Sequence, residues 1–361
     1  MFYTCRFIKE IKAKNMINRI RNIYKHLQDE KSKFVFSNRL LYSLTGDYRY
    51  IREIVAALPQ MNRLDGTMAF CEEHRDNVVF YGAGNDLEHL AFIYQGFHPK
   101  YICDKSVEKQ QHGWRNIAVM SPEELVCKNK GKYVAVSTSL FYEQIKQFLL
   151  DNGFEQEKIL DVFGDIMISL EAEQYFDADI MIPRQGEALI DGGCFNCGTD
   201  EFFIKWCSGD YHKIYAFEPD RKNYENCIKV SKEDGIRNIE ILNKGLWDCT
   251  TELPFMEAGD AGSKISGGTG NKVISTVKVD DIVGNDRISL IKLDVEGAEL
   301  KALRGAEQTI RRCRPRLAIC VYHKPEDIME IPEYVLSLHS DYKIFFRHYS
   351  LSHIETVMYA I

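Results

Sequence analysis

The chain of 361 residues lacks the marks of two large classes of protein. No apolar run approaches the roughly 18–20 residues of a membrane-spanning helix. There is also no excess of positive charge, because 46 basic residues stand against 53 acidic ones and the formal net charge is −7. A protein that follows a phosphate backbone needs clustered Lys and Arg, so nucleic acid is not an expected partner.

The cysteines show no sign of a disulfide framework. There are 11 of them, an odd number, and they are scattered through segments that read as buried. The N-terminus also lacks the continuous apolar core of a secretory signal, so we expect reduced thiols and a cytoplasmic location. Cys194 and Cys197 form a C-x-x-C pair, but no second ligand pair follows at short spacing, so a zinc or redox site is not expected.

Residues 1–75 are expected to form an N-terminal helical segment. Apolar residues recur at helical spacing from Phe7 to Leu27, and a second amphipathic stretch runs from about Leu40 to Leu58. A basic amphipathic helix can lie on a membrane surface, but acidic residues dilute the charge here. Packing on the next domain or on a second copy of the chain is the favoured reading, and the latter is compatible with a homodimer.

Residues 76–162 are expected to form a small Rossmann-like α/β domain with a parallel sheet. Gly82-x-Gly84 before a helix, with Asp104 after the next strand, is the skeleton of a dinucleotide site. The third glycine position is Leu87, which weakens that interpretation. Nucleotide or sugar-nucleotide binding and a purely structural turn both stay open.

Residues 163–361 are expected to form a second, larger α/β domain. Strands at 187–191, 213–217, 239–242, 289–293 and 316–321 alternate with helices, and two strands, 343–346 and 355–361, end the chain. This order predicts a doubly wound mixed sheet, in which ligands bind at the carboxyl ends of the strands. The Gly/Ser-rich loop at 258–270 reads equally as an active-site lid and as a surface hairpin loop.

Two landmarks at these strand ends point to a nucleoside ligand. Asp191-Gly-Gly193 leads from an apolar strand through a glycine turn into a helix. An acidic residue there disfavours a phosphate and favours a ligand with a cationic amine. Glu218 follows the next strand, where a carboxylate can accept both ribose hydroxyls.

The third landmark is acidic and follows the strand at 289–293. Asp294, Glu296 and Glu299 lie within six residues where a buried strand meets a helix. Such charges at a sheet edge are costly unless they are paired or functional. We expect Asp294 and Glu296 to face the cleft, whereas Glu299 can simply favour the helix N-terminus.

Together these segments resemble the FkbM-type family of S-adenosylmethionine-dependent methyltransferases. Asp191-x-Gly193 resembles the family's donor-binding turn, and Ala216-Phe-Glu218-Pro219 its ribose-binding strand end. Residues 292–306 and 314–332 resemble two further family segments. The resemblance covers about residues 175–361, and residues 76–162 resemble the small Rossmann-like domain that precedes some members. The family turn has a glycine where this chain has Cys197, with Gly198 next.

The resemblance implies a Rossmann-like methyltransferase sheet and the cofactor S-adenosyl-L-methionine. It implies methyl transfer to a hydroxyl of a glycan, sugar nucleotide or natural product, for example in polysaccharide biosynthesis. No Asn/Asp-Pro-Pro-aromatic turn follows the strand at 289–293, and this absence favours O-methylation over N-methylation. Two alternatives remain: a non-catalytic scaffold, and a sugar-nucleotide oxidoreductase or isomerase that uses residues 76–162.

A sugar hydroxyl is a poor nucleophile at neutral pH, so a base within hydrogen-bond reach is expected. His323 follows the strand at 316–321 and is the first candidate, although a structural histidine is the alternative. Asp294 is the second candidate base or positions the acceptor, and Glu296 holds the donor amine or an acceptor hydroxyl.

The expected cofactor-binding residues are Asp191, Gly193, Asn196, Glu218 and Asp248. No metal is expected, because a metal at Asp294 needs several convergent oxygen ligands that the sequence does not locate.

Overall fold

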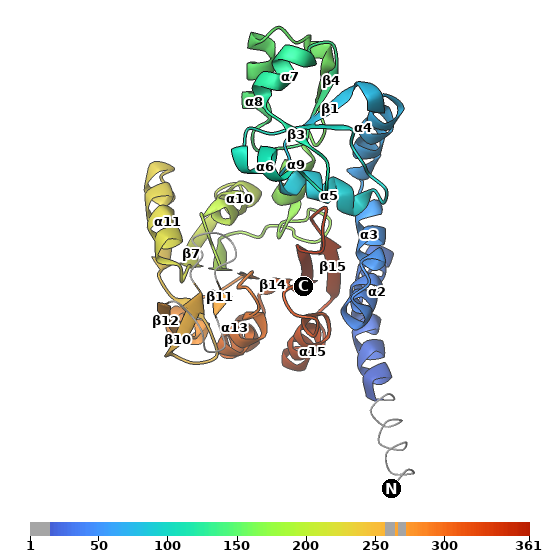
Figure 1. Ribbon diagram of the computed structural model, residues 1–361. Helices are drawn as coiled ribbons and strands as arrows, with labels where there is room; N and C mark the ends of the chain where they lie inside the picture. The colour runs from blue at the N-terminus through green and yellow to red at the C-terminus, as the bar shows by residue number, and fades with distance from the viewer. Residues whose placement is uncertain (1–14, 257–263, 266–271) are drawn as a thin grey trace. The chain divides into compact units, whose positions relative to one another are not determined.

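The computed structural model describes residues 15–256, 264–265 and 272–361, and the chain divides into two compact units (Figure 1). The large unit holds the described residues up to Asp47, Ala172–Tyr349 and His353–Ile361, and the small unit holds Tyr48–Glu171 and Ser350–Ser352. The domain boundaries expected after residues 75 and 162 stay a prediction. Apart from Lys264–Ile265, the loop expected at 258–270 lies outside the described residues, as do residues 1–14.

The large unit is built on a seven-stranded sheet in the order β15-β16-β14-β13-β6-β7-β8. Only β16, the last strand in the sequence, runs antiparallel to its neighbours β14 and β15. The expected doubly wound mixed sheet is therefore confirmed. Strands β6 and β13 are adjacent, and the chain continues from them towards opposite edges of the sheet. The strands are β6 (Glu187–Gly192), β7 (Tyr211–Phe217), β8 (Ile239–Leu242), β13 (Leu290–Leu293), β14 (Arg316–Cys320), β15 (Ile344–His348) and β16 (Thr356–Ala360).

The centre of this sheet is covered on both faces. Every residue of β6, β13, β14 and β16 is buried, which explains why these strands read as apolar runs in the sequence. The charged residues within them must therefore be paired. At one end of the sheet Glu187 and Arg316 form such a pair at 2.5 Å, with both side chains almost fully buried.

The helices of the large unit include one break that the sequence analysis missed. Residues 299–312, where the alternation of strands and helices predicts one helix, form two helices that meet at Ala306 (φ −108°, ψ 9°). Gly305 lies close to Trp247, because a Cβ there would be 2.0 Å from the Trp247 carbonyl oxygen. Residues 15–26 are also helical. The other helices are α2 (Glu30–Thr45), α10 (Gly198–Trp206), α11 (Arg221–Glu233), α12 (Val279–Val283), α13 (Glu299–Gly305), α14 (Glu307–Cys313) and α15 (Asp327–Leu338).

A second, four-stranded sheet in the large unit was not expected. Its order is β11-β10-β12-β9, and it is inserted between β8 and β13. Its strands are β9 (Gly245–Leu246), β10 (Thr251–Met256), β11 (Lys264–Ile265) and β12 (Lys272–Val277).

The N-terminal helix α2 packs on β15 of the large unit. The Phe36 and Phe346 rings lie 5.4 Å apart, and the Phe346 N–H donates to Ser32 Oγ at 3.0 Å. Helix α2 thus packs within the large unit, on a strand near the end of the chain, and not on residues 76–162 that follow it in the sequence. The stretch from Leu40 to Leu58 is not one helix, because Gly46 ends α2 in a left-handed conformation (φ 68°) and α3 begins afresh.

The small unit is the expected smaller α/β fold, a five-stranded parallel sheet in the order β3-β2-β1-β4-β5. Its strands are β1 (Val78–Tyr81), β2 (Tyr101–Cys103), β3 (Val119–Met120), β4 (Tyr133–Val136) and β5 (Ile159–Asp161). Its helices are α3 (Arg49–Ala56), α4 (Met61–Glu73), α5 (Asn85–Ile93), α6 (Val107–His112), α7 (Pro122–Lys128) and α8 (Tyr142–Asp151), and α9 (Ile166–Glu173) ends at the boundary with the large unit. Among the described residues, no helix is long and apolar enough to cross a membrane.

We expect Asp29→Asn to separate the cap of α2 from its charge. Asn keeps the cap, which Asp29 makes by accepting from Ser32 N–H, but loses the ion pair with the buried Arg347 at 2.7 Å. Burial opposes ionisation, but bonds from Arg347 and Ser32 lower the pKa of Asp29 from 3.8 to about 2. Because Asp29 is partly exposed, the loss should be only about 1 kcal/mol at pH 7.

Because the pKa of Asp29 is lower in the folded protein, its ionised form stabilises the fold above about pH 4, and this contribution is lost as pH falls towards 2. Urea unfolding at pH 7 and at pH 3 should therefore show the difference from wild type shrinking in acid. Asp210→Asn, an exposed aspartate of the same unit, is the control. An unchanged difference at pH 3 would mean that the ion pair contributes nothing.

Candidate functional site

A buried ion pair lies where β6 and β13 end side by side. Asp191 and Lys292 are direct partners in the parallel ladder, and Lys292 Nζ lies 2.8 Å from Asp191 Oδ1, with both side chains almost fully buried. Lys292 Nζ also donates to the Gly193 carbonyl at 2.7 Å. Burial alone would lower the pKa of Lys292, but Asp191 and Asp294 outweigh it and raise that pKa. Asp191 therefore forms an ion pair with Lys292 and lies beneath the turn, so it is not exposed at the surface of the turn.

The turn after β6 is tightly fitted to the end of β13. Gly193 has φ 78°, and a Cβ there would lie 1.9 Å from the Asp294 carbonyl oxygen, so the position accepts only glycine. Cys197, the departure from the family pattern, takes a left-handed conformation at φ 65° and immediately precedes α10. The chain thus keeps the turn geometry at a cost of about 1–2 kcal/mol for a residue with a Cβ.

Glu218 follows β7 and faces this turn. Its Oε2 accepts from Phe195 N–H at 3.0 Å, and its Oε1 accepts from Asp220 N–H at 2.8 Å. Burial raises the pKa of Glu218 to about 7. The structure therefore joins Glu218 to the glycine turn, as expected from two neighbouring parallel strands.

The other two expected cofactor-binding residues differ in setting. Asn196 is exposed at the tip of the turn, where its Oδ1 accepts from Gly198 N–H at 3.0 Å. Asp248 follows β9 and pairs with Lys301 of α13 at 2.6 Å, and the Lys301 ammonium lies 5.4 Å from the centre of the Trp247 ring.

The expected catalytic residues come together beyond the end of β13. His323 Nε2 lies 3.6 Å from both Asp294 Oδ1 and Glu296 Oε2, and His323 Nδ1 lies 2.9 Å from Glu299 Oε1. Glu299 also accepts from Val295 N–H at 2.9 Å, so it braces the turn as well as the histidine. Glu296 itself has φ 53°, a strained backbone of the kind that clusters at functional sites.

The charges of this group are set by one another. Burial would lower the pKa of His323, but Glu296, Glu299 and Asp294 outweigh it and raise the pKa to about 11. Burial would likewise raise the pKa of Asp294, but Lys292 and His323 lower it. At neutral pH the site therefore holds an imidazolium among carboxylates, and His323 in this state is not a free base.

Three site residues were missed by the sequence analysis. Tyr175 donates to Asp294 Oδ2 at 2.8 Å, and the Tyr322 hydroxyl lies 3.2 Å from both Asp294 Oδ1 and Glu355 Oε1. Burial, then Asp294, raises the pKa of Glu355 to about 7. Tyr322 precedes His323 directly and was open to inference, whereas Tyr175 and Glu355 come from loops without a motif.

The described residues contain three groups of side chains that could bind a metal ion, and two of these groups share Asp294. Asp294, Glu299 and His323 place one donor atom each within 4.8 Å of one another, as do Asp294, Cys320 and Glu355. Each of these two groups offers two carboxylate oxygens, beside a histidine nitrogen in one and a cysteine sulfur in the other, so the absence of a metal at Asp294 stays a prediction. The third grouping is Cys194, Cys197 and Cys227.

The glycine turn of the small unit is braced from within. Asp104 Oδ2 accepts from Ala83 N–H at 2.7 Å and lies 3.1 Å from Lys109 Nζ. Asp104 thus braces its turn much as Glu218 braces the glycine turn of the large unit, and nucleotide binding and a structural turn both stay predictions.

A family model described as "Methyltransferase FkbM domain" matches residues 192–347. No curated protein matches the chain significantly. Among solved structures, a methyltransferase FkbM from Methylobacillus flagellatus KT is 17% identical, with a TM-score of 0.50, and the match covers 89% of this chain and 100% of that one. At that identity the likeness shows the fold alone.

Two further solved structures match about half of the chain. An rRNA methylase from Streptococcus thermophilus is 17% identical, with coverage of 54% of this chain and 94% of that one and a TM-score of 0.35. Fibrillarin from Aeropyrum pernix, solved with bound S-adenosyl-L-methionine, is 15% identical, with coverage of 54% and 74% and a TM-score of 0.34.

We expect Lys292→Met and Asp191→Val each to cost about 3–5 kcal/mol of unfolding free energy, because each leaves its partner charged, buried and alone. The double variant should cost clearly less than the sum of the two. Urea unfolding of the four proteins measures this coupling. Lys213→Met, which breaks a partly exposed pair with Glu240 at 2.9 Å, should cost about 0–1 kcal/mol. Additive losses for Lys292 and Asp191 would contradict the pairing.

Proposed function

We propose that this chain is an S-adenosylmethionine-dependent O-methyltransferase that acts on a sugar hydroxyl of a glycan, sugar nucleotide or natural product. The match of residues 192–347 to the FkbM methyltransferase model supports the proposal. One observation carries the proposal. Side chains suited to a nucleoside and side chains suited to a hydroxyl group lie at the adjacent carboxyl ends of β7, β6, β13 and β14.

The donor half is the glycine turn with Glu218. A carboxylate at the end of β7 suits the two ribose hydroxyls, and the absence of a Cβ at Gly193 keeps the turn against β13. Asp191 acts as a positioning residue, because Lys292 holds it beneath the turn. Asn196 and Asp248 are assigned to the rim of this half. When bound, S-adenosylmethionine supplies a methyl group on a sulfonium, whose leaving group needs little help.

The acceptor half is the acidic group around His323. Asp294 is ionised and 24% exposed, so it can accept a hydrogen bond from an acceptor hydroxyl and orient it. His323 keeps Asp294 ionised and also lies against Glu296, whose partly exposed carboxylate can take a second hydroxyl. A cluster of acceptors of this kind suits a substrate with several hydroxyl groups.

The proton lost by the acceptor has a path through the chain's own residues. Tyr322 OH lies between Asp294 and Glu355, and Glu355 has a pKa of about 7, near the working pH that suits a general base. We assign the proton to Asp294 first and to Glu355 through Tyr322. The base role expected of His323 thus passes to the carboxylates, and His323 becomes the cation that sets their charge.

The direct test is methyl transfer from S-adenosylmethionine to a panel of monosaccharides, sugar nucleotides and matched amino sugars, with release of S-adenosylhomocysteine as the readout. Methylation of hydroxyl acceptors supports the proposal. Methylation confined to the amino groups would overturn O-methylation. Binding of neither S-adenosylmethionine nor S-adenosylhomocysteine, measured by titration calorimetry, would overturn the donor site.

We expect Glu218→Gln to remove a pH dependence as well as affinity. The ribose hydroxyls donate stronger hydrogen bonds to an ionised carboxylate than to a protonated one. The affinity of the wild type should therefore rise as pH increases through about 7, the pKa of Glu218. The variant should bind S-adenosylhomocysteine at least about tenfold more weakly at pH 8, a loss of one charged hydrogen bond, with little change between pH 6 and pH 8. Glu225→Gln, an exposed carboxylate of α11, is the control. A variant that keeps the wild-type pH profile would exclude Glu218 from the donor site.

We expect Asp294→Asn to lower kcat by about 10²–10⁴-fold while the Kd for S-adenosylhomocysteine stays within a few-fold of wild type.

His323→Gln should act through the charge of the carboxylates, so its pH–rate profile should shift towards higher pH as Asp294 and Glu355 lose a neighbouring cation. Steady-state rates from pH 6 to pH 9 give both quantities. An Asp294→Asn enzyme with unchanged kcat would leave the acidic group without a role in the reaction.

A further inference from the structure

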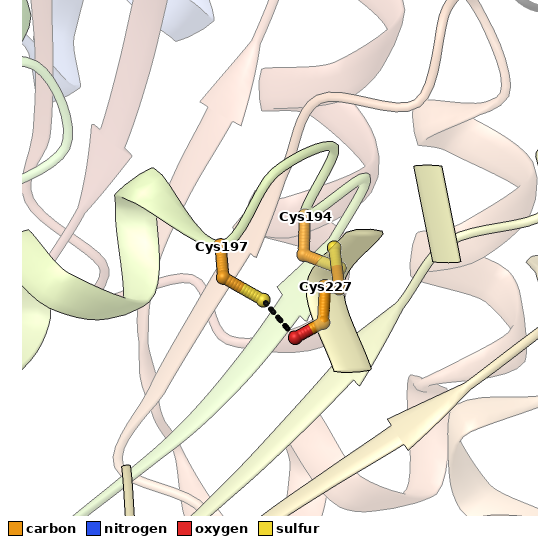
Figure 2. Close-up of side chains that lie close together, drawn as sticks. All are labelled: Cys194, Cys197 and Cys227. Carbon is orange, nitrogen blue, oxygen red and sulfur yellow. Dashed lines mark hydrogen bonds between the residues drawn. The ribbon is translucent and has the colours of Figure 1, made fainter. Parts of the chain in front are cut away.

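Three cysteines meet beneath the donor turn. Cys194 and Cys197 lie on the turn after β6, and Cys227 reaches them from the buried face of α11 (Figure 2). All three are free and buried, and their sulfur atoms lie within 4.8 Å of one another. The sequence spacing shows only the first two, because the third lies 30 residues beyond Cys197 and is placed by the packing of α11.

One sulfur–sulfur distance in the cluster is close to that of two ligands around a metal ion. Cys194 Sγ and Cys227 Sγ are 3.7 Å apart. Two thiolates bound to one tetrahedral zinc ion at about 2.3 Å are separated by about 3.8 Å. A disulfide would require about 2.05 Å, so the pair is not posed as a bond.

A buried carboxylate lies near the cysteines. Asp200, in the first turn of α10, is fully buried, and it interacts with the thiol of Cys197, which lies three residues before it. A metal ion at the sulfur atoms would also offset part of the cost of burying this carboxyl group.

We propose that Cys194, Cys197 and Cys227 bind one zinc ion as thiolates, and that this ion fastens the donor turn to α11. Binding displaces three thiol protons to solvent, and involves no oxidation. Three thiolates give the site a net charge of −1, and a fourth ligand from outside this group completes the tetrahedron. The role of the site is structural, and it is separate from the acidic group at Asp294.

The backbone conformation of Cys197 is unusual for a residue with a side chain. Cys197 holds a left-handed conformation that glycine would take without strain, and its buried sulfur points to the carbonyl of Cys227 at 3.9 Å (Figure 2). A ligand role gives a reason for a side chain at a position where the backbone favours none.

Zinc content of the full-length protein, purified without chelators from zinc-supplemented cells, is the first test. We expect about one zinc per chain by mass spectrometry of the metal, and loss of most of it in Cys227→Ser and in Cys194→Ser. Cys207→Ser is the matched control, because Cys207 is buried at the other end of α10 and outside the cluster. A metal-free wild type, or equal zinc in wild type and Cys227→Ser, would overturn the proposal.

A second measurement does not depend on variants that fold. Wild-type protein stripped of metal and reloaded with Co²⁺ should show the intense visible absorption of tetrahedral thiolate coordination, and added Zn²⁺ should abolish it. Weak octahedral absorption, or a Cys194–Cys227 disulfide found by alkylation and mass spectrometry of the unstripped protein, would contradict a zinc site. Neither readout involves methyl transfer, so a failed proposal for the reaction would leave this result standing.

Discussion

The ion pair between Lys292 and Asp191 is the constraint on which the site depends. Both residues lie on strands that are buried along their whole length, so neither charge can reach water. Each must keep the other, and that requirement fixes the register of β6 against β13 at the point where the chain turns to opposite edges. Because Lys292 also binds the Gly193 carbonyl, the same ammonium holds the glycine turn in place. The sheet itself therefore holds the start of the turn in place.

The electrostatics of the acceptor half follow from the same lysine. Lys292 and His323 are the cations that act on Asp294, whereas Glu296, Glu299 and Glu355 surround it with negative charge. The result is a graded set of acids: Asp294 is held ionised, and Glu355 titrates near neutrality. Such a separation of pKa values among neighbouring carboxyls would suit the proposed division of tasks, in which one carboxyl orients a hydroxyl and another receives its proton.

Sequence reasoning succeeded where a local pattern had only one structural solution. The buried strands read as apolar runs. Asp191 lies at the end of one of them, and Glu218 and Asp294 follow two others, so their meeting at one end of the sheet could be predicted. It failed where tertiary packing decides. Tyr175 and Glu355 come from irregular loops, and Cys227 lies on a helix whose buried face the pattern alone does not define. The role of His323 could not be read either, because its pKa depends on Glu299, whose side chain folds back onto the turn.

The contact between α2 and β15 joins the first part of the large unit to nearly the last. Asp29 and Arg347, which pair across it, are 318 residues apart in the chain. At roughly 5–20 residues per second, a ribosome needs on the order of 15–60 seconds to make the partner of that helix. Throughout this interval α2 has no strand to pack on, whereas Tyr48–Glu171, the main part of the small unit, is already made. The edge strand β15 therefore gains its cover only as the chain is completed.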